Sequence, residues 1–139
     1  MFQKIMAPID LEHADKLQPA RQAAADLGNH YGAPVVYVAA TATTPGPMGH
    51  TPQEFAQNLQ AFADGEATAH GHKTEAHSVI CNDPAAEVDS ALLQAADDVG
   101  ADLIVMASHV PGVAENVHLL PNNGGSVASH FKRSVMIIR

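Results

Sequence analysis

The sequence contains a single cysteine, no tryptophan and only 4% aromatic residues. One cysteine, Cys81, excludes an internal disulfide, so a reduced, cytoplasmic setting is expected. No apolar run approaches the about 20 residues that a membrane-spanning helix needs. The N-terminal MFQKIMAPID also lacks the apolar region and cleavage site of a signal peptide, so neither membrane insertion nor export is expected.

Basic residues are also scarce. Seven Lys and Arg stand against fifteen Asp and Glu, which gives a net charge of −8 with histidine taken as neutral. The only local basic pair, Lys132-Arg133, is too small to form a stripe that neutralises phosphates along a nucleic acid. Nucleic acid and anionic membranes are therefore not expected as partners.

What the sequence does contain is a globular composition, with 46% hydrophobic and 16% charged residues in 139 positions. That length is enough to bury an ordinary core in a single domain, residues 1–139. With aromatic residues so few, the core must be built mainly from alanine, valine, isoleucine and leucine.

Short apolar runs alternate with segments of helical periodicity. The runs lack a clean polar alternation, which is typical of strands buried on both faces; they cover residues 4–9, 34–40, 75–81, 102–107 and 135–138. The helices are predicted over 15–31, from the capping box Thr51-Pro52-Gln53-Glu54 onward, from Asp83-Pro84 to Gly100, and over about 124–131. This order predicts an α/β fold with a parallel sheet and helices on both faces.

In such sheets, ligands bind at the carboxyl ends of the strands, near the point where the strand order reverses. The residues that follow the strands there are Asp10, 40–42 and 108–123. Two roles remain open for Asp10: it either contacts a ligand hydroxyl or a metal ion, or it caps the following helix. The turn-rich segment 41–50 is interpreted as a surface loop, acting as a lid beside the strand ends.

Other polar residues give weaker signals. Gly124-Gly125-Ser126, at a predicted helix start, suits a phosphate, but no Lys follows as in a Walker loop. His70, His72 and His77 lie close in sequence without a metal-ligand spacing, so they are interpreted as solvated surface residues. Cys81 is expected to be a buried, inert thiol. No catalytic constellation is recognisable among these residues, so an enzymatic function is not favoured.

Five segments resemble the universal stress protein family, and together they span the whole chain: KIMAPID, GAPVVYVAA, CNDPAAEV, GADLIVMASHVPG and HFKRSVMIIR. Their order and spacing carry the resemblance. The ASHVP form is similar to the branch of the family whose loop reads Ser-His-x-Pro.

The resemblance implies a flavodoxin-like sandwich, doubly wound around five parallel strands, that forms a homodimer through its last strand, from Val135 to Ile138. It implies ATP, alone or with Mg²⁺, as the ligand of those members that bind a nucleotide. Because no catalytic constellation is recognisable here, at most slow hydrolysis of ATP is expected. Carried onto this sequence, the implied binding residues are Pro8, Asp10, Ala40, Met106, Ala107, His109, Val110, Asn122, Asn123 and Gly124.

ATP-binding members carry a Gly-x2-Gly-x9-Gly-Ser/Thr signature after the fourth strand, and this sequence departs from it. Ala107 and Val110 replace the first two glycines, and Pro121-Asn122 replaces the last pair, unless a shifted alignment retains Gly125-Ser126. Pro121 has no N–H to offer a phosphate. Two functions therefore remain open: an ATP-binding regulatory dimer, which is favoured, and a dimeric interaction module that has lost the phosphate loop.

Overall fold

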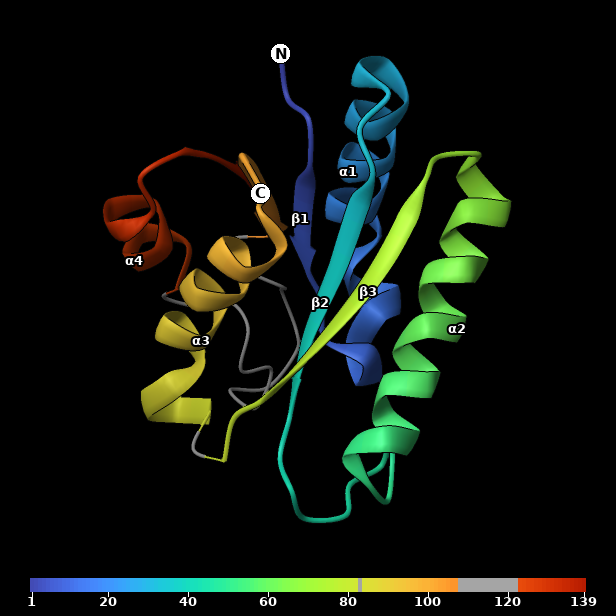
Figure 1. The fold of residues 1–139 in the computed structure, drawn as a ribbon, viewed down its shortest axis with the longest axis vertical. Coiled ribbons are helices and arrows are strands. Elements are labelled where there is room, and N and C mark those ends of the chain that lie inside the picture. The colour runs from blue at the N-terminus through green and yellow to red at the C-terminus, as the bar shows by residue number, and fades with distance from the viewer. Residues whose placement is uncertain (83, 108–122) are drawn as a thin grey trace.

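The computed structural model describes residues 1–82, 84–107 and 123–139 (Figure 1). They form a five-stranded, all-parallel sheet with the strand order β3-β2-β1-β4-β5. The strands are β1 (Ile5–Pro8), β2 (Val35–Thr41), β3 (Thr74–Ile80), β4 (Leu103–Ala107) and β5 (Ser134–Ile138). The predicted doubly wound parallel sheet is confirmed, and each predicted strand lies within one residue of its observed ends.

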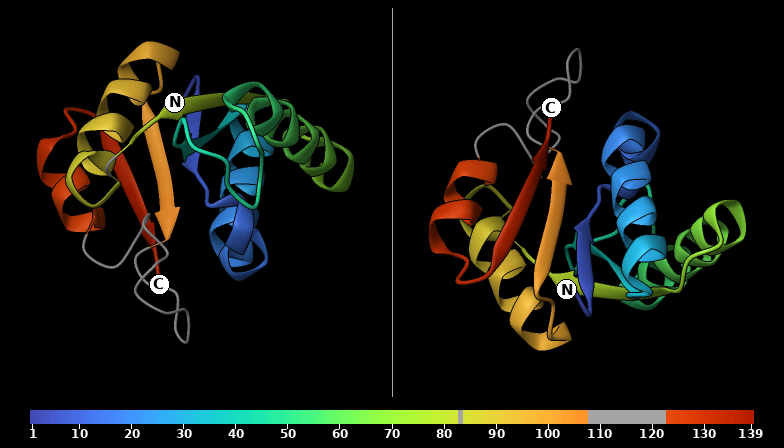
Figure 2. Two further views of the ribbon diagram at one scale, coloured as in Figure 1. Left: turned by 90° about the horizontal axis from the view of Figure 1, so that it is seen from below. Right: turned by 90° about the horizontal axis from the view of Figure 1, so that it is seen from above.

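Helices cover both faces of the sheet. A 3-10 segment, η1 (Leu11–Leu17), precedes the helices α1 (Gln18–Tyr31), α2 (Pro52–His70), α3 (Pro84–Val99) and α4 (Asn123–His130). Figure 2 shows α1 and α2 on one face of the sheet, with α3 and α4 on the other. The strand order reverses between β1 and β4, so the chain crosses to the second face through α3.

The inner strands β1, β2 and β4 lack an alternation of polar and apolar residues because both of their faces are buried. All residues of β1 and β4 are buried, as are the first five residues of β2. The edge strands β3 and β5 are partly exposed. Helices above and below the inner strands remove both side-chain faces from water, so neither face requires polar residues.

Local sequence signals set the helix ends. Gly32, Gly71 and Gly100 follow α1, α2 and α3 with φ of 63°, 76° and 74°, a conformation that favours glycine. The Thr51 side chain accepts a hydrogen bond from the Glu54 backbone N–H at 3.1 Å, which confirms the predicted cap. The Glu54 carboxylate, however, bonds the backbone N–H of His50, one residue before the cap.

The predicted helix over 15–31 is interrupted. The α-helix starts at Gln18, and the residues before it form the 3-10 segment with a kink at His13. Pro19 explains the break, because its ring clashes with the carbonyl four residues earlier and is tolerated only in the first turn of a helix.

Within the parts of the chain that the structure describes, no helix combines the length and apolar character needed to cross a membrane.

Candidate functional site

A cavity of about 240 Å³ opens at the carboxyl ends of β1 and β2. Its wall combines the two strand ends, η1, the loop after β2, the first turn of α2 and one residue of α3. The lining residues are Ile9, Asp10, Leu11, Glu12, Ala40, Thr41, Ala42, Thr44, Pro45, Gly46, Pro47, Met48, Gly49, Phe55 and Val88. The cavity therefore lies at the sheet edge where ligands of open α/β sheets bind.

Asp10 is held in place by its own neighbours. Its carboxylate accepts a hydrogen bond from the Glu12 backbone N–H at 3.0 Å, and its second oxygen lies 3.0 Å from Nδ1 of His13. The capping role predicted for Asp10 is confirmed. A carboxylate can accept further hydrogen bonds, so its place in the cavity wall leaves a ligand contact possible.

The loop after β2 folds over the cavity. Gly46 and Gly49 exchange two backbone hydrogen bonds of 3.0 and 3.2 Å, which close a tight turn around Pro47 and Met48. Asn58 on α2 donates a hydrogen bond of 2.8 Å to the Met48 carbonyl. The predicted surface loop beside the strand ends is confirmed, and its turn is tied to α2.

Glycine at position 49 is required by space. A Cβ added there would lie 2.7 Å from the Phe55 backbone nitrogen and 2.9 Å from its Cα, distances that side chains do not tolerate. The loop thus packs directly on the first turn of α2, at the rim of the cavity.

The structure brings two of the predicted binding residues, Asp10 and Ala40, to this cavity. Pro8 is buried as the last residue of β1, and Met106 and Ala107 are buried at the end of β4; none of the three lines the cavity. His109, Val110 and Asn122 lie outside the described residues. Asn123 and Gly124 form the start of α4.

Several lining residues escaped the sequence analysis. Glu12, Phe55 and Val88 belong to three different elements, and only the fold brings them together. For Phe55 a signal existed, because it directly follows the capping sequence of α2 and therefore faces the preceding loop. Glu12 gave no signal beyond its position two residues after Asp10.

Asp10, Glu12 and His13 place one potential metal-ligand atom each within 4.8 Å of one another, the one such group in the described part of the chain. Both Asp10 oxygens already interact with Glu12 and His13 themselves. These interactions give the cluster a structural role in the cap of η1.

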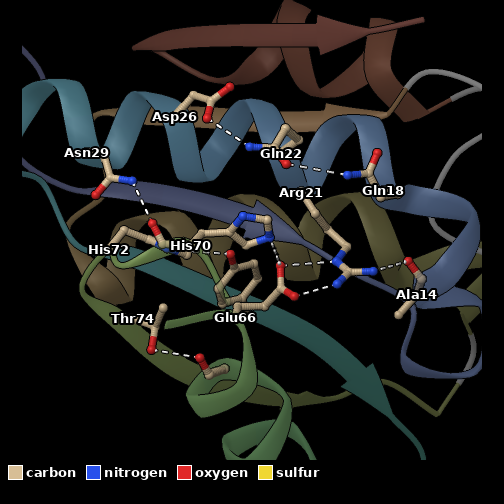
Figure 3. A network of polar contacts seen from close by, with 12 residues as sticks. Ala14, Gln18, Arg21, Gln22, Asp26, Asn29, Glu66, His70, His72 and Thr74 are labelled. Atoms are coloured by element: carbon tan, nitrogen blue, oxygen red, sulfur yellow. Dashed lines mark hydrogen bonds and ion pairs between the residues drawn. The ribbon is translucent and has the colours of Figure 1, made fainter. Parts of the chain in front are cut away.

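A second polar cluster lies buried between α1, α2 and β2 (Figure 3). The guanidinium of Arg21 pairs with the Glu66 carboxylate through two nitrogens: Nε lies 3.1 Å from Oε2, and Nη2 bonds Oε1. The third nitrogen donates a 3.0 Å hydrogen bond to the carbonyl of Ala14 in η1. Glu66 is only 4% exposed, so this pair joins two helices and braces the segment that carries Asp10.

His72 extends this cluster into the core. Its Nε2 lies 3.0 Å from the hydroxyl of Tyr37, and the residue is 5% exposed. The interpretation of His72 as a surface residue is therefore wrong. The left-handed turn at Gly71 reverses the chain after α2 and directs the following residue toward β2.

Burial favours the neutral forms of the His72 imidazole and the Tyr37 hydroxyl. Burial, with a smaller effect of the neighbouring His70, lowers the pKa of His72, although Glu66 opposes the shift. Burial and the negative charge of Glu66 raise the pKa of Tyr37 well above its ordinary value.

The thiol of Cys81, directly after β3, is buried, as the sequence analysis expected.

Comparisons with known proteins agree with this architecture. The model of the Universal stress protein family matches residues 1–139, so the chain belongs to that family. No curated protein matches the sequence.

Solved structures of the same fold extend over nearly the whole chain. A universal stress protein from Archaeoglobus fulgidus is 18% identical, with all of both chains covered and a TM-score of 0.69. A universal stress protein in complex with cAMP is 21% identical, with 99% of this chain and 97% of that chain covered and a TM-score of 0.67. An Arabidopsis thaliana family member with AMP bound is 14% identical, with 98% and 90% covered and a TM-score of 0.65.

Proposed function

We propose that this protein binds an adenine nucleotide in the cavity at the carboxyl ends of β1 and β2 and acts as a regulator. The observation that carries the proposal is the cavity itself, which Asp10, Ala40 and the loop 44–49 line together. Its volume of about 240 Å³ is below the roughly 300–1,000 Å³ of typical ligand pockets. It therefore suits the base and sugar of a nucleotide, with the phosphates extending outside it.

Two further facts support an adenine ligand. Structures of two relatives are complexes with cAMP and AMP, and one from Archaeoglobus fulgidus is a complex with dAMP. The resemblance of the sequence to ATP-binding members adds ATP, alone or with Mg²⁺, as the nucleotide to test first. The remaining implied contacts are Pro8, Met106, Ala107, His109, Val110, Asn122, Asn123 and Gly124.

The direct test is to denature freshly purified protein and to identify any released nucleotide by chromatography and mass spectrometry. Near-stoichiometric adenine nucleotide supports the proposal. A protein that is empty and takes up neither AMP nor ATP with Mg²⁺ contradicts it. That result would favour the alternative, a dimeric interaction module without a nucleotide.

Substitutions in the cavity wall locate the site. Ala40→Leu places three additional carbon atoms in the cavity and is expected to weaken nucleotide binding at least tenfold by occupying the space of the ligand. Ala61→Leu, on the exposed side of α2, is the matched control and is expected to leave binding unchanged. Equal affinity of Ala40→Leu and the control for AMP would place the nucleotide elsewhere.

Asp10 needs a variant that preserves its cap. Asp10→Ser retains an oxygen that accepts the Glu12 N–H but removes the carboxylate. If Asp10 contacts the nucleotide, Asp10→Ser weakens binding while the unfolding midpoint stays within a few degrees of wild type. Unchanged affinity would leave Asp10 with its capping role alone.

We also propose that the regulator is a cytoplasmic homodimer joined through β5. This strand ends the sheet, so its outer backbone groups have no strand beside them among the described residues, and Met136 is 38% exposed. Pairing two copies across a two-fold axis would cover this edge. Light scattering should show a dimer at micromolar concentration and a shift toward monomer in Met136→Lys, and a monomeric wild type would contradict the proposal.

A further inference from the structure

The cavity has an unusual charge for a nucleotide site. Two carboxylates, Asp10 and Glu12, belong to its wall, whereas no Lys or Arg does. All seven Lys and Arg residues lie in described parts of the chain, and the segment 108–126 contains none in its sequence. The segment 108–126 therefore supplies no Lys or Arg to the ligand.

Three of the seven basic side chains have contacts away from the cavity. Arg21 pairs with Glu66, Arg133 donates a hydrogen bond to the carbonyl of Ala101, and Lys4 lies 3.5 Å from the Glu75 carboxylate. Arg139 follows β5 at the carboxyl edge of the sheet. In the sheet, β5 lies two strands away from β1, at a distance of about 10 Å.

Glu12 carries the less compensated of the two cavity charges. The Asp10 carboxylate interacts with the Glu12 N–H and with His13. Among the described residues, no hydrogen bond or ion pair involves the Glu12 carboxylate, which is on an exposed residue of η1. Glu12 therefore adds a negative charge to the cavity wall, and the net charge of −8 acts in the same direction.

We propose that Glu12, together with Asp10, makes this cavity select adenine ligands by their charge. Adenosine and AMP bind in preference to free ATP, and ATP binds well only when a divalent cation neutralises its phosphates. This inference rests on the proposed nucleotide site. Its physical basis is that AMP carries about two negative charges and each further phosphate adds to them, whereas the base and sugar are neutral and are not repelled by the carboxylates.

The test compares adenosine, AMP and ATP by isothermal titration calorimetry at low ionic strength, first with EDTA and then with excess Mg²⁺. In EDTA we expect ATP to bind at least tenfold more weakly than AMP, and we expect excess Mg²⁺ to remove most of this difference in affinity. A higher salt concentration should also reduce the difference in affinity, because exposed charges are screened.

A matched pair of variants assigns the effect to Glu12. Glu12→Gln removes the charge at the cavity and should strengthen free ATP binding by roughly three- to tenfold with little effect on adenosine. Asp15→Asn removes the same charge from the same exposed segment outside the cavity wall and should change ATP affinity much less. Unfolding midpoints of both variants verify that each remains folded.

The outcomes distinguish a failure of charge selection from a failure of the proposed nucleotide site. If ATP in EDTA binds as tightly as AMP or more tightly, charge selection is wrong while the nucleotide site stands. Equal effects of Glu12→Gln and Asp15→Asn would overturn the role of Glu12. If none of the three ligands binds with or without Mg²⁺, the proposed nucleotide site is wrong, and charge selection is wrong with it.

Discussion

The hydroxyl of Tyr37 lies 3.0 Å from Nε2 of His72, while Nδ1 of the same ring is buried without a hydrogen-bond partner among the described residues. A protonated His72 would place a second, unpaired N–H donor in the core. The ring is therefore best accommodated in its neutral form, as the lowered pKa of His72 also indicates.

This arrangement makes stability depend on pH. His72 titrates near 6.5 in the unfolded chain, and its pKa is lower in the folded protein. Below pH 6.5 the unfolded state takes up the proton first, so the free energy of unfolding falls as the pH decreases toward the folded pKa. The slope from this residue is at most about 1.4 kcal/mol per pH unit.

His72→Gln isolates this contribution, because glutamine can still bond Tyr37 but does not titrate. Urea unfolding at several pH values should show a smaller loss of stability on acidification in His72→Gln than in wild type. His50→Gln, at an exposed position, should retain the wild-type dependence. If the free energy of unfolding depends on pH equally in wild type and in His72→Gln, the conclusion that His72 is neutral in the folded protein is wrong.

The Arg21–Glu66 pair is expected to be important for stability. Glu66→Gln leaves the guanidinium of Arg21 without its carboxylate in a site where the side chain of Glu66 is 5% exposed and that of Arg21 is 19% exposed. We expect a loss of about 2–4 kcal/mol in the free energy of unfolding, measured by urea denaturation.

The exposed pair Lys4–Glu75 provides the control, with side chains 31% and 50% exposed. Glu75→Gln should cost no more than about 1 kcal/mol, because water screens this pair. Similar losses for the two variants would mean that burial does not decide the strength of these pairs.

The turn over the cavity gives a third prediction. Gly49→Ala forces a methyl group against the Phe55 backbone, so the turn must move away from α2. We expect a lower unfolding midpoint and weaker nucleotide binding. Gly46→Ala, in the same turn, meets no protein atom within 4 Å and should leave the unfolding midpoint unchanged. A Gly49→Ala protein with wild-type binding would show that the turn does not shape the site.

A glycine inside α2 offers a stabilising change. Gly65 has ordinary helical φ, and a Cβ added there meets no atom within 4 Å. Gly65→Ala should therefore raise the free energy of unfolding by about 0.5–1 kcal/mol by restricting the unfolded chain. Gly71→Ala is the contrasting variant, since its φ of 76° should make the same substitution destabilising.

Much of the fold was predictable from local patterns in the sequence. The unbroken apolar runs identified the strands, because a strand covered on both faces needs no polar alternation. Gly32 and Gly100 marked helix ends, since both lie after helical segments and adopt a conformation that other residues avoid. The cap at Thr51 and the capping role of Asp10 followed from the same kind of short-range hydrogen bonding.

The tertiary structure decided which distant residues meet. Glu12, Phe55 and Val88 form one cavity wall only because the parallel sheet aligns the ends of β1 and β2 beneath the loop after β2. His72 appeared to be a surface residue, since nothing in its local sequence shows that the chain reverses at Gly71 toward Tyr37. Local sequence determines the elements because their signals act within a few residues, whereas burial and charge at the site depend on contacts that form only when the sheet assembles.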